Sequence, residues 1–241
     1  MRNSGFTLAE TLITLGVIGI VAAMTIPALI NKYNEIITVA KVKETYSVFV
    51  QAEKRWEDDL DCVGDVAGCL TNYDKFSYKF FEDLTKNMKV LDTAYLGQDK
   101  SKKNWLSKTP AKRLDGKAST VHGVYADNKW FSSILLYNGV SISCCIDLYK
   151  TDITCYMDVN AEKMPNRVGL DVFPFGMGAY KNDYYKSIHP YFADDDFNSE
   201  DGGMCAIRIG KICSPDDGRS PTAYILKHNK VFDIRKLGYK K

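Results

Sequence analysis

Residues 5–30 have the sequence GFTLAETLITLGVIGIVAAMTIPALI, and this stretch decides the architecture of the chain. Between Phe6 and Ile30 the only ionisable side chain is that of Glu10. The run is longer than the roughly 20 apolar residues that cross a bilayer as a helix, so it predicts a membrane-spanning helix. Arg2, on the short leading side, favours a cytoplasmic N-terminus.

Glu10 is the residue in this run that a simple anchor does not explain. A carboxylate costs roughly 2.5–3.5 kcal/mol at the centre of a membrane helix, and less near its end. A secretory signal would have a shorter apolar core followed by a small-residue cleavage site, and no clear site of that kind follows Ile30. An uncleaved anchor remains the alternative, but it has no need of the carboxylate. Glu10 therefore predicts a partner.

The hexapeptide Gly5-Phe6-Thr7-Leu8-Ala9-Glu10 resembles the prepilin motif of type IV pilins and type II secretion pseudopilins. The resemblance implies that a membrane prepilin peptidase cuts between Gly5 and Phe6 and N-methylates Phe6. It also implies that Glu10, fifth in the mature chain, pairs with the Phe6 ammonium of a neighbouring subunit. Two opposite charges in an apolar bundle would offset part of each other's desolvation.

Pro27 lies inside the apolar run, where it removes one helical hydrogen bond and kinks the chain. Pilin-like helices often have a proline at this depth, so the resemblance implies an assembly role in which the helix loosens and stretches. The alternative is a proline that a membrane helix simply tolerates. Both interpretations stay open.

After the apolar run, residues 31–60 predict an amphipathic continuation of the same helix. Apolar residues recur there in steps of three or four: Val39, Val42, Tyr46, Phe49, Ala52, Trp56 and Leu60. A helix from Phe6 to Leu60 would be roughly 80 Å long at 1.5 Å per residue. A free coiled-coil stalk is the alternative, but the stripe spans only about three heptads without a strict 3–4 alternation, which favours a helix that covers a globular domain.

The remaining residues, 61–241, predict a soluble domain with an antiparallel meander. Phe76, Phe80, Phe81, Leu84 and Met88 suggest a short amphipathic helix. Strands are predicted at Trp130–Tyr137, Val140–Tyr149 and Ile153–Val159, with Asn138-Gly139 as a type I′ hairpin turn. The whole is an α+β fold: a long N-terminal helix, half membrane and half amphipathic, packed on a meander in a pilin-like layout. Residues 1–5 form the leader and residues 6–30 the membrane or filament-core segment.

Seven cysteines make disulfides a natural expectation for an exported domain. The close spacings suggest local bridges, Cys62–Cys69 and Cys205–Cys213; seven reduced thiols in a cytosolic domain are the alternative. Cys144 and Cys145 would lie on opposite faces of a strand and so have different roles.

The segment 158–171 contains a candidate calcium site. Asp158, Asn160 and Asp171 offer the hard oxygen ligands that calcium prefers. However, Lys163 stands where an EF-hand needs glycine, and no glutamate closes the loop. A turn held by Asp and Asn hydrogen bonds is the favoured interpretation. Apart from this possible Ca²⁺, we expect no cofactor.

Charge and motifs argue against nucleic-acid binding and catalysis. The net charge is +2, from 32 basic and 30 acidic residues, without a concentrated basic face. His122, His189 and His228 lack helical metal spacing, and no hydrolase, zinc-protease or phosphate-loop motif is present. We therefore expect that this protein is not an enzyme.

Together these features predict a structural subunit, either a pseudopilin or a minor pilin, of a type II secretion or type IV pilus-type filament. Its expected location is the inner membrane, crossed once, with the soluble domain outside the cytoplasm and a filament after assembly. The resemblance implies three partners: prepilin peptidase, other pilin-like subunits and the inner-membrane assembly machinery. The alternative is a membrane-anchored adhesion module with its ligand site in residues 175–241.

Overall fold

The structure is a computed structural model. It describes residues 7–74, 78–95, 131–146, 152–161, 163–164, 166–178, 189–190, 222, 225–226 and 229–231. The chain divides into two compact units, Met1–Ile37 and Thr38–Lys241. The first helix, α1 (Leu8–Asp59), contributes to both. Its 52 residues confirm the long N-terminal helix that the sequence predicts.

Pro27 lies inside α1 without ending it. Because proline has no N–H, the Ala23 carbonyl lacks its usual donor four residues later. One turn earlier, the Thr25 hydroxyl donates to the Val21 carbonyl at 2.9 Å. The role of Pro27 in assembly stays a prediction.

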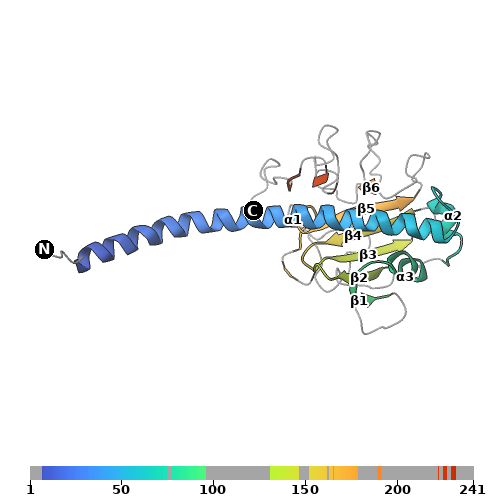
Figure 1. Ribbon diagram of the computed structural model, residues 1–241, viewed down its shortest axis with the longest axis horizontal. Helices are drawn as coiled ribbons and strands as arrows, with labels where there is room; N and C mark the ends of the chain where they lie inside the picture. Colours follow the sequence, from blue (N-terminus) through green and yellow to red (C-terminus); the bar gives the residue numbers. More distant parts are fainter. Residues whose placement is uncertain are drawn as a thin grey trace, which may run out of the picture. The chain divides into compact units, whose positions relative to one another are not determined.

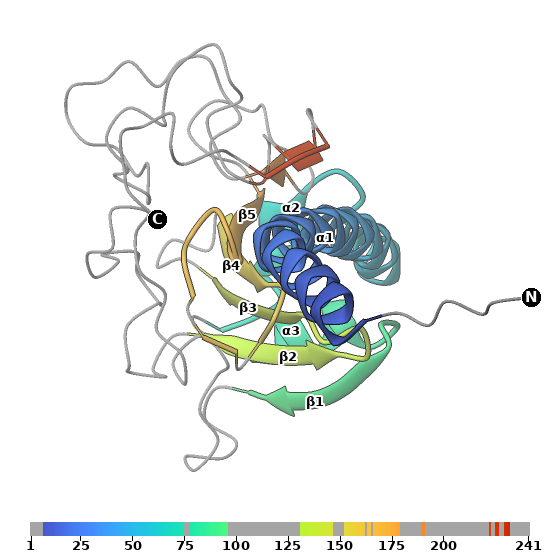
Figure 2. The same ribbon diagram turned by 90° about the vertical axis from the view of Figure 1, so that its left-hand side faces the viewer.

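The soluble domain is built on one antiparallel sheet of six strands in the order β1-β2-β3-β4-β5-β6. Its strands are β1 (Val90–Ala94), β2 (Ser132–Leu136), β3 (Ser141–Ile146), β4 (Asp152–Asp158), β5 (Val172–Gly178) and β6 (His189–Pro190). The strands follow one another in space as in sequence, which confirms the meander and adds β1, β5 and β6 to it. The sheet curves around the Thr38–Asp59 part of α1, as Figure 2 shows.

The turn between β2 and β3 forms where Asn138-Gly139 predicts it, but it is not type I′. That type needs positive φ at both central residues. Gly139 has φ of 78°, whereas Asn138 is not in the left-handed region. Tyr137, predicted to end the strand, lies in the turn instead. The Leu136 N–H donates to the Val140 carbonyl at 2.8 Å, which closes a three-residue loop with glycine in its left-handed position.

The core lies between the sheet and the Thr38–Asp59 part of α1, which crosses one sheet face (Figure 1). Val42, Phe49, Ala52 and Trp56 from the predicted stripe are buried there. The Phe49 ring meets the Phe175 ring of β5 edge to face, with centroids 5.0 Å apart. Each fully buried side chain of this size contributes about 1.5–3 kcal/mol.

Two short helices close one end of this core. They are α2 (Val66–Leu70) and α3 (Lys79–Thr85). Phe80, Phe81 and Leu84 are buried as the amphipathic pattern predicts, but α3 is shorter than that pattern. Trp56 of α1 is fixed here, because its indole N–H donates to the Tyr73 hydroxyl, which donates to Asp83.

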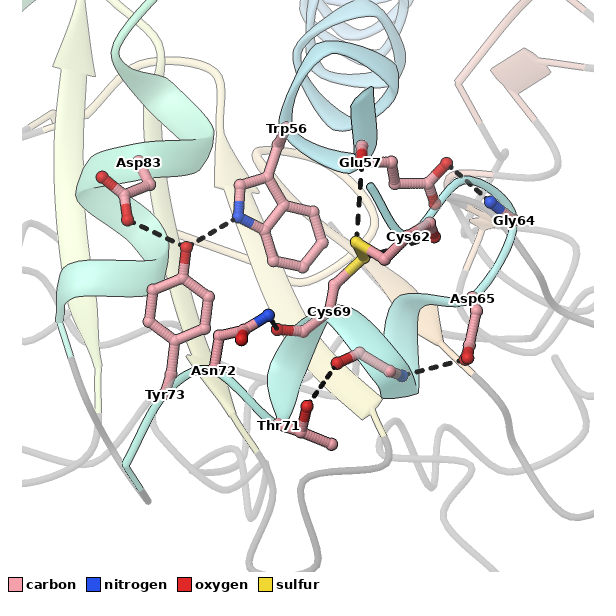
Figure 3. Close-up of a disulfide and its surroundings, with 11 residues drawn as sticks. Trp56, Glu57, Cys62, Gly64, Asp65, Cys69, Thr71, Asn72, Tyr73 and Asp83 are labelled. Carbon is pink, nitrogen blue, oxygen red and sulfur yellow. Dashed lines mark hydrogen bonds between the residues drawn. A yellow bond between two sulfur atoms is a disulfide. The ribbon is translucent and has the colours of Figure 1, made fainter. Parts of the chain in front are cut away.

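Among the described residues, disulfides link the chain at two places. Cys62 and Cys69, the pair suggested by their spacing, are bonded beside the end of α1 (Figure 3). Cys144 and Cys155 are bonded across β3 and β4, a pair that the sequence did not suggest. They lie directly opposite each other, with Cα atoms 4.2 Å apart. Cys205 and Cys213 lie outside the described residues.

Candidate functional site

The N-terminus of α1 carries a capping box formed by Thr7 and Glu10. One Glu10 carboxylate oxygen accepts hydrogen bonds from the Thr7 N–H at 2.8 Å and from the Thr7 hydroxyl at 2.9 Å. In return, the Glu10 N–H donates to the Thr7 hydroxyl oxygen at 3.3 Å. A Thr-x-x-Glu pattern at the start of a helix satisfies backbone donors in this reciprocal way.

The capping box fixes Glu10 within the first turn of α1. A negative charge is favourable there, because the unpaired N–H groups give that end of the helix a partial positive charge. The Thr7-Leu8-Ala9-Glu10 spacing was the signal for this contact, and sequence reasoning missed it. Gly5 and Phe6 lie outside the described residues, so their roles in cleavage and methylation stay predictions, as does the assembly role of Glu10.

The apolar surface that follows Glu10 is exposed. No residue of α1 between Leu8 and Ile37 is buried. Its most apolar 18-residue window has a mean hydropathy of 2.3. Large exposed side chains recur on all sides: Leu8, Leu12, Ile13, Leu15, Val17, Ile18, Ile20, Val21, Met24, Ile26, Leu29, Ile30, Tyr33 and Ile36.

By length and composition, α1 can cross a membrane, and within the described part of the chain it is the one helix that can. An exposed apolar surface of this extent marks a membrane or protein interaction site, since contact between apolar side chains and water is energetically unfavourable. The capped Glu10 lies at the start of that surface.

The predicted calcium ligands do come together, in a loop after β4. Asp158 is buried, and one of its oxygens accepts from the N–H groups of Asn160 and Ala161, both at 3.0 Å. Its other oxygen accepts from the Asn166 amide at 2.9 Å. Asp171 accepts from the Asn160 amide at 3.3 Å and from the Arg167 N–H at 3.2 Å.

Burial dominates the electrostatics of these two carboxyls. It raises the pKa of Asp158 to about 7 and that of Asp171 to about 6, despite the hydrogen bonds that each accepts. Lys41 of α1 reaches this loop, where its ammonium donates to the Val159 carbonyl at 2.8 Å. Burial also lowers the pKa of Lys41.

This donor set fits a structural turn better than a cation site. Every oxygen of both carboxylates is already an acceptor for protein donors. Within the described residues, no group of three or more His, Cys, Asp or Glu side chains is placed to hold a metal ion. Calcium needs six to eight oxygens, so it would have to rearrange this loop. Calcium binding stays a prediction.

Comparison with known proteins finds one match. The family model described as the prokaryotic N-terminal methylation motif matches residues 1–26. No curated protein and no solved structure matches the chain. The matched segment contains the Gly5–Phe6 junction, the Thr7–Glu10 capping box and the first part of the exposed apolar surface. The chain therefore carries the N-terminal signature of type IV pilins and pseudopilins.

Proposed function

We propose that this chain is a pilin-like structural subunit, a pseudopilin or minor pilin, of a type II secretion or type IV pilus-type filament. One observation carries the proposal: the methylation motif leads directly into a helix whose apolar surface is exposed throughout its first unit. The motif and the helix indicate a membrane-anchored, single-pass protein of the prepilin-processed kind.

In this proposal, prepilin peptidase cleaves between Gly5 and Phe6 and methylates the new N-terminus. Arg2 keeps the leader in the cytoplasm, so the soluble domain lies outside it. The mature helices leave the inner membrane through the assembly machinery and pack against one another. Each Glu10 then faces the Phe6 ammonium of a neighbour, and mutual neutralisation offsets part of the cost of burying both charges.

The capping box supports a specific role for Glu10 before assembly. In the unassembled subunit, Thr7 already donates two hydrogen bonds to one oxygen of this carboxylate. These bonds reduce the desolvation free energy of Glu10 while the subunit is in the membrane. The second oxygen stays available for the neighbouring ammonium. Glu10→Gln keeps the shape of the side chain and removes its charge, so it separates capping from charge pairing.

The test follows processing and assembly in the same cells. Mass spectrometry should find Glu10→Gln cleaved and methylated at Phe6, while the filament fraction falls at least about tenfold, the effect of losing a charge pair worth about 1.4 kcal/mol. Normal filaments from this variant would contradict the role of Glu10. Glu35→Gln is the matched control for Glu10→Gln, because Glu35 pairs with Lys32 beyond the apolar run.

Gly5→Leu should leave an uncut precursor, and a trimmed chain would exclude Gly5 as the cleavage determinant.

A further inference from the structure

The end of α1 presents a rigid, acidic loop tip that consists of Asp61–Asp65. At its centre, Val63 is 71% exposed. Asp61 and Asp65, one on each side, are also exposed. The tip is therefore an apolar knob between two carboxylates, which makes it suited to a groove with an apolar floor and basic edges.

One disulfide and three hydrogen bonds hold the acidic tip in place, and Figure 3 shows the disulfide and its surroundings. The Cys62–Cys69 disulfide closes the loop. Asp61 has φ of 53°, and the N–H groups of Asp61 and Cys62 donate to the carbonyls of Asp58 and Glu57. This is the two-bond pattern that ends a helix with a left-handed residue. The Gly64 N–H donates to the Glu57 carboxylate at 3.1 Å. A tip fixed in this way loses little conformational entropy on binding.

A groove with the complementary character lies between α1 and the β2–β3 turn. Its volume is about 550 Å³. Its lining comes from three segments: Glu44, Val48, Gln51, Ala52 and Arg55 of α1; Asn87, Met88 and Lys89 before β1; and Leu136 at the end of β2 with Tyr137 and Asn138 of the turn. We call it the helix–hairpin groove.

The groove floor is apolar and its edges are charged unevenly. Ala52, Met88 and Leu136 form a floor whose residues are at most 9% exposed. Arg55 and Lys89 supply two positive charges, and Glu44 lies roughly 16 Å away along the helix at 1.5 Å per residue. The ion pairs formed within the described residues are Lys32–Glu35 and Lys86–Asp59, so they leave both groove cations unneutralised.

The tip of one copy cannot enter its own groove. The middle of the groove, near Val48 and Ala52, lies about 15 Å back along the helix axis from the end of α1. The disulfide and the helix-terminating hydrogen bonds prevent the tip from folding back over that distance. A second copy can supply the same tip without any rearrangement.

We infer that the acidic tip of one copy docks into the helix–hairpin groove of the next. Val63 covers the apolar floor, while Asp61 and Asp65 face Arg55 and Lys89; Glu44 repels the tip from the other end and so fixes its direction. Two different surfaces meet in this contact, so it can repeat without closing, as a filament requires. The inference rests on the proposed function, because it concerns contacts between soluble domains of an assembling subunit.

Photo-cross-linking of the full-length chain in cells that assemble it tests this contact. A benzoylphenylalanine residue replaces Val63, and peptide mass spectrometry locates the linked residue. We expect links between two copies, at residues 44–55, 87–89 or 136–138. The matched control replaces Leu91, which is 55% exposed but belongs to neither surface, and should give at least about tenfold fewer links. Absence of links from position 63, or links to a different protein or another region, would overturn the inference.

Charge reversal gives a second readout. Arg55→Glu should lower the yield of the link from position 63 about fivefold, the effect typical of one exposed charge pair. Asp61→Arg in the same chain should restore it, and an unchanged yield in the single variant would contradict the docking direction.

A third probe separates this inference from the proposed function. Benzoylphenylalanine in place of Leu12 reports contacts between the apolar helices. Links from position 12 without links from position 63 would overturn the docking and leave the filament intact. Absence of both would overturn both.

Discussion

The two parts of α1 differ in what covers their apolar side chains. From Leu8 to Ile37 none is buried, whereas from Thr38 to Asp59 Val42, Phe49, Ala52 and Trp56 face the protein's own sheet. The local helix is the same, so secondary structure alone does not distinguish them. The difference teaches that the first part has to be covered from outside the soluble domain, by lipid or by other copies, while the second part completes a core.

The largest expected effect separates these two parts directly. Phe49→Ala should lower the free energy of unfolding by about 3–5 kcal/mol, because it removes a buried ring and its edge-to-face contact with Phe175. Denaturant unfolding of the full-length protein in detergent measures this. Leu15→Ala is the matched control and should change it by less than about 0.5 kcal/mol, since Leu15 is 66% exposed. Equal losses in the two variants would contradict the division of α1.

A somewhat smaller effect comes from the Cys144–Cys155 disulfide, which ties the sheet beneath the second part of α1. Removing both sulfurs with Cys144→Ala and Cys155→Ala should destabilise the protein by about 3 kcal/mol, mainly because the unfolded chain gains freedom. The same unfolding assay measures it. The comparison variant is Cys145→Ala, since Cys145 faces away from this bond and is only half-buried. The expectation fails if the two changes have equal effects.

The smallest expected effect is a pH dependence that belongs only to the soluble domain. Burial raises the pKa of Asp158 to about 7, so the folded state binds a proton more readily than the unfolded state does. The free energy of unfolding should therefore rise as the pH falls from 8 to 5, by about 2 kcal/mol from this group. Asp158→Asn should remove most of this rise.

The control for the pH experiment is Asp74→Asn, at an exposed position outside the 158–171 loop. A pH profile that is unchanged in Asp158→Asn would show that Asp158 is not the titrating group. Addition of calcium at pH 8 completes the experiment: a rise in stability that Asp158→Asn abolishes would support a calcium site, and no rise would support the structural turn.

Much of the fold could be predicted because its signals are local. The apolar run and the three- and four-residue steps after it define α1, and Asn138-Gly139 between two β-rich runs places the hairpin. The type of turn was predicted wrongly because Asn138 does not adopt the positive φ that type I′ requires. The spacing of Cys62 and Cys69 was also informative, because only a short loop separates them.

What could not be predicted depends on register and on distant contacts. Cys144 rather than Cys145 faces Cys155 because β3 and β4 pair in one particular register, and a one-residue shift would exchange the two cysteines. The raised pKa values of Asp158 and Asp171 depend on burial beneath other segments, which no local pattern encodes. The helix–hairpin groove needs α1 and Tyr137 side by side, although they are far apart in the sequence.

The sequence by itself determined the N-terminal segment: a methylation motif, an apolar helix and a carboxylate that has to find a partner. Hydrophobicity and short spacings are sufficient there, because a helix satisfies its own backbone hydrogen bonds. Only the tertiary structure decided which ring of the sheet meets Phe49 of α1, that Cys144 rather than Cys145 is bonded to Cys155, and how the acidic tip is held. Those outcomes depend on packing between segments that are distant in the chain, and packing is a property of the folded molecule.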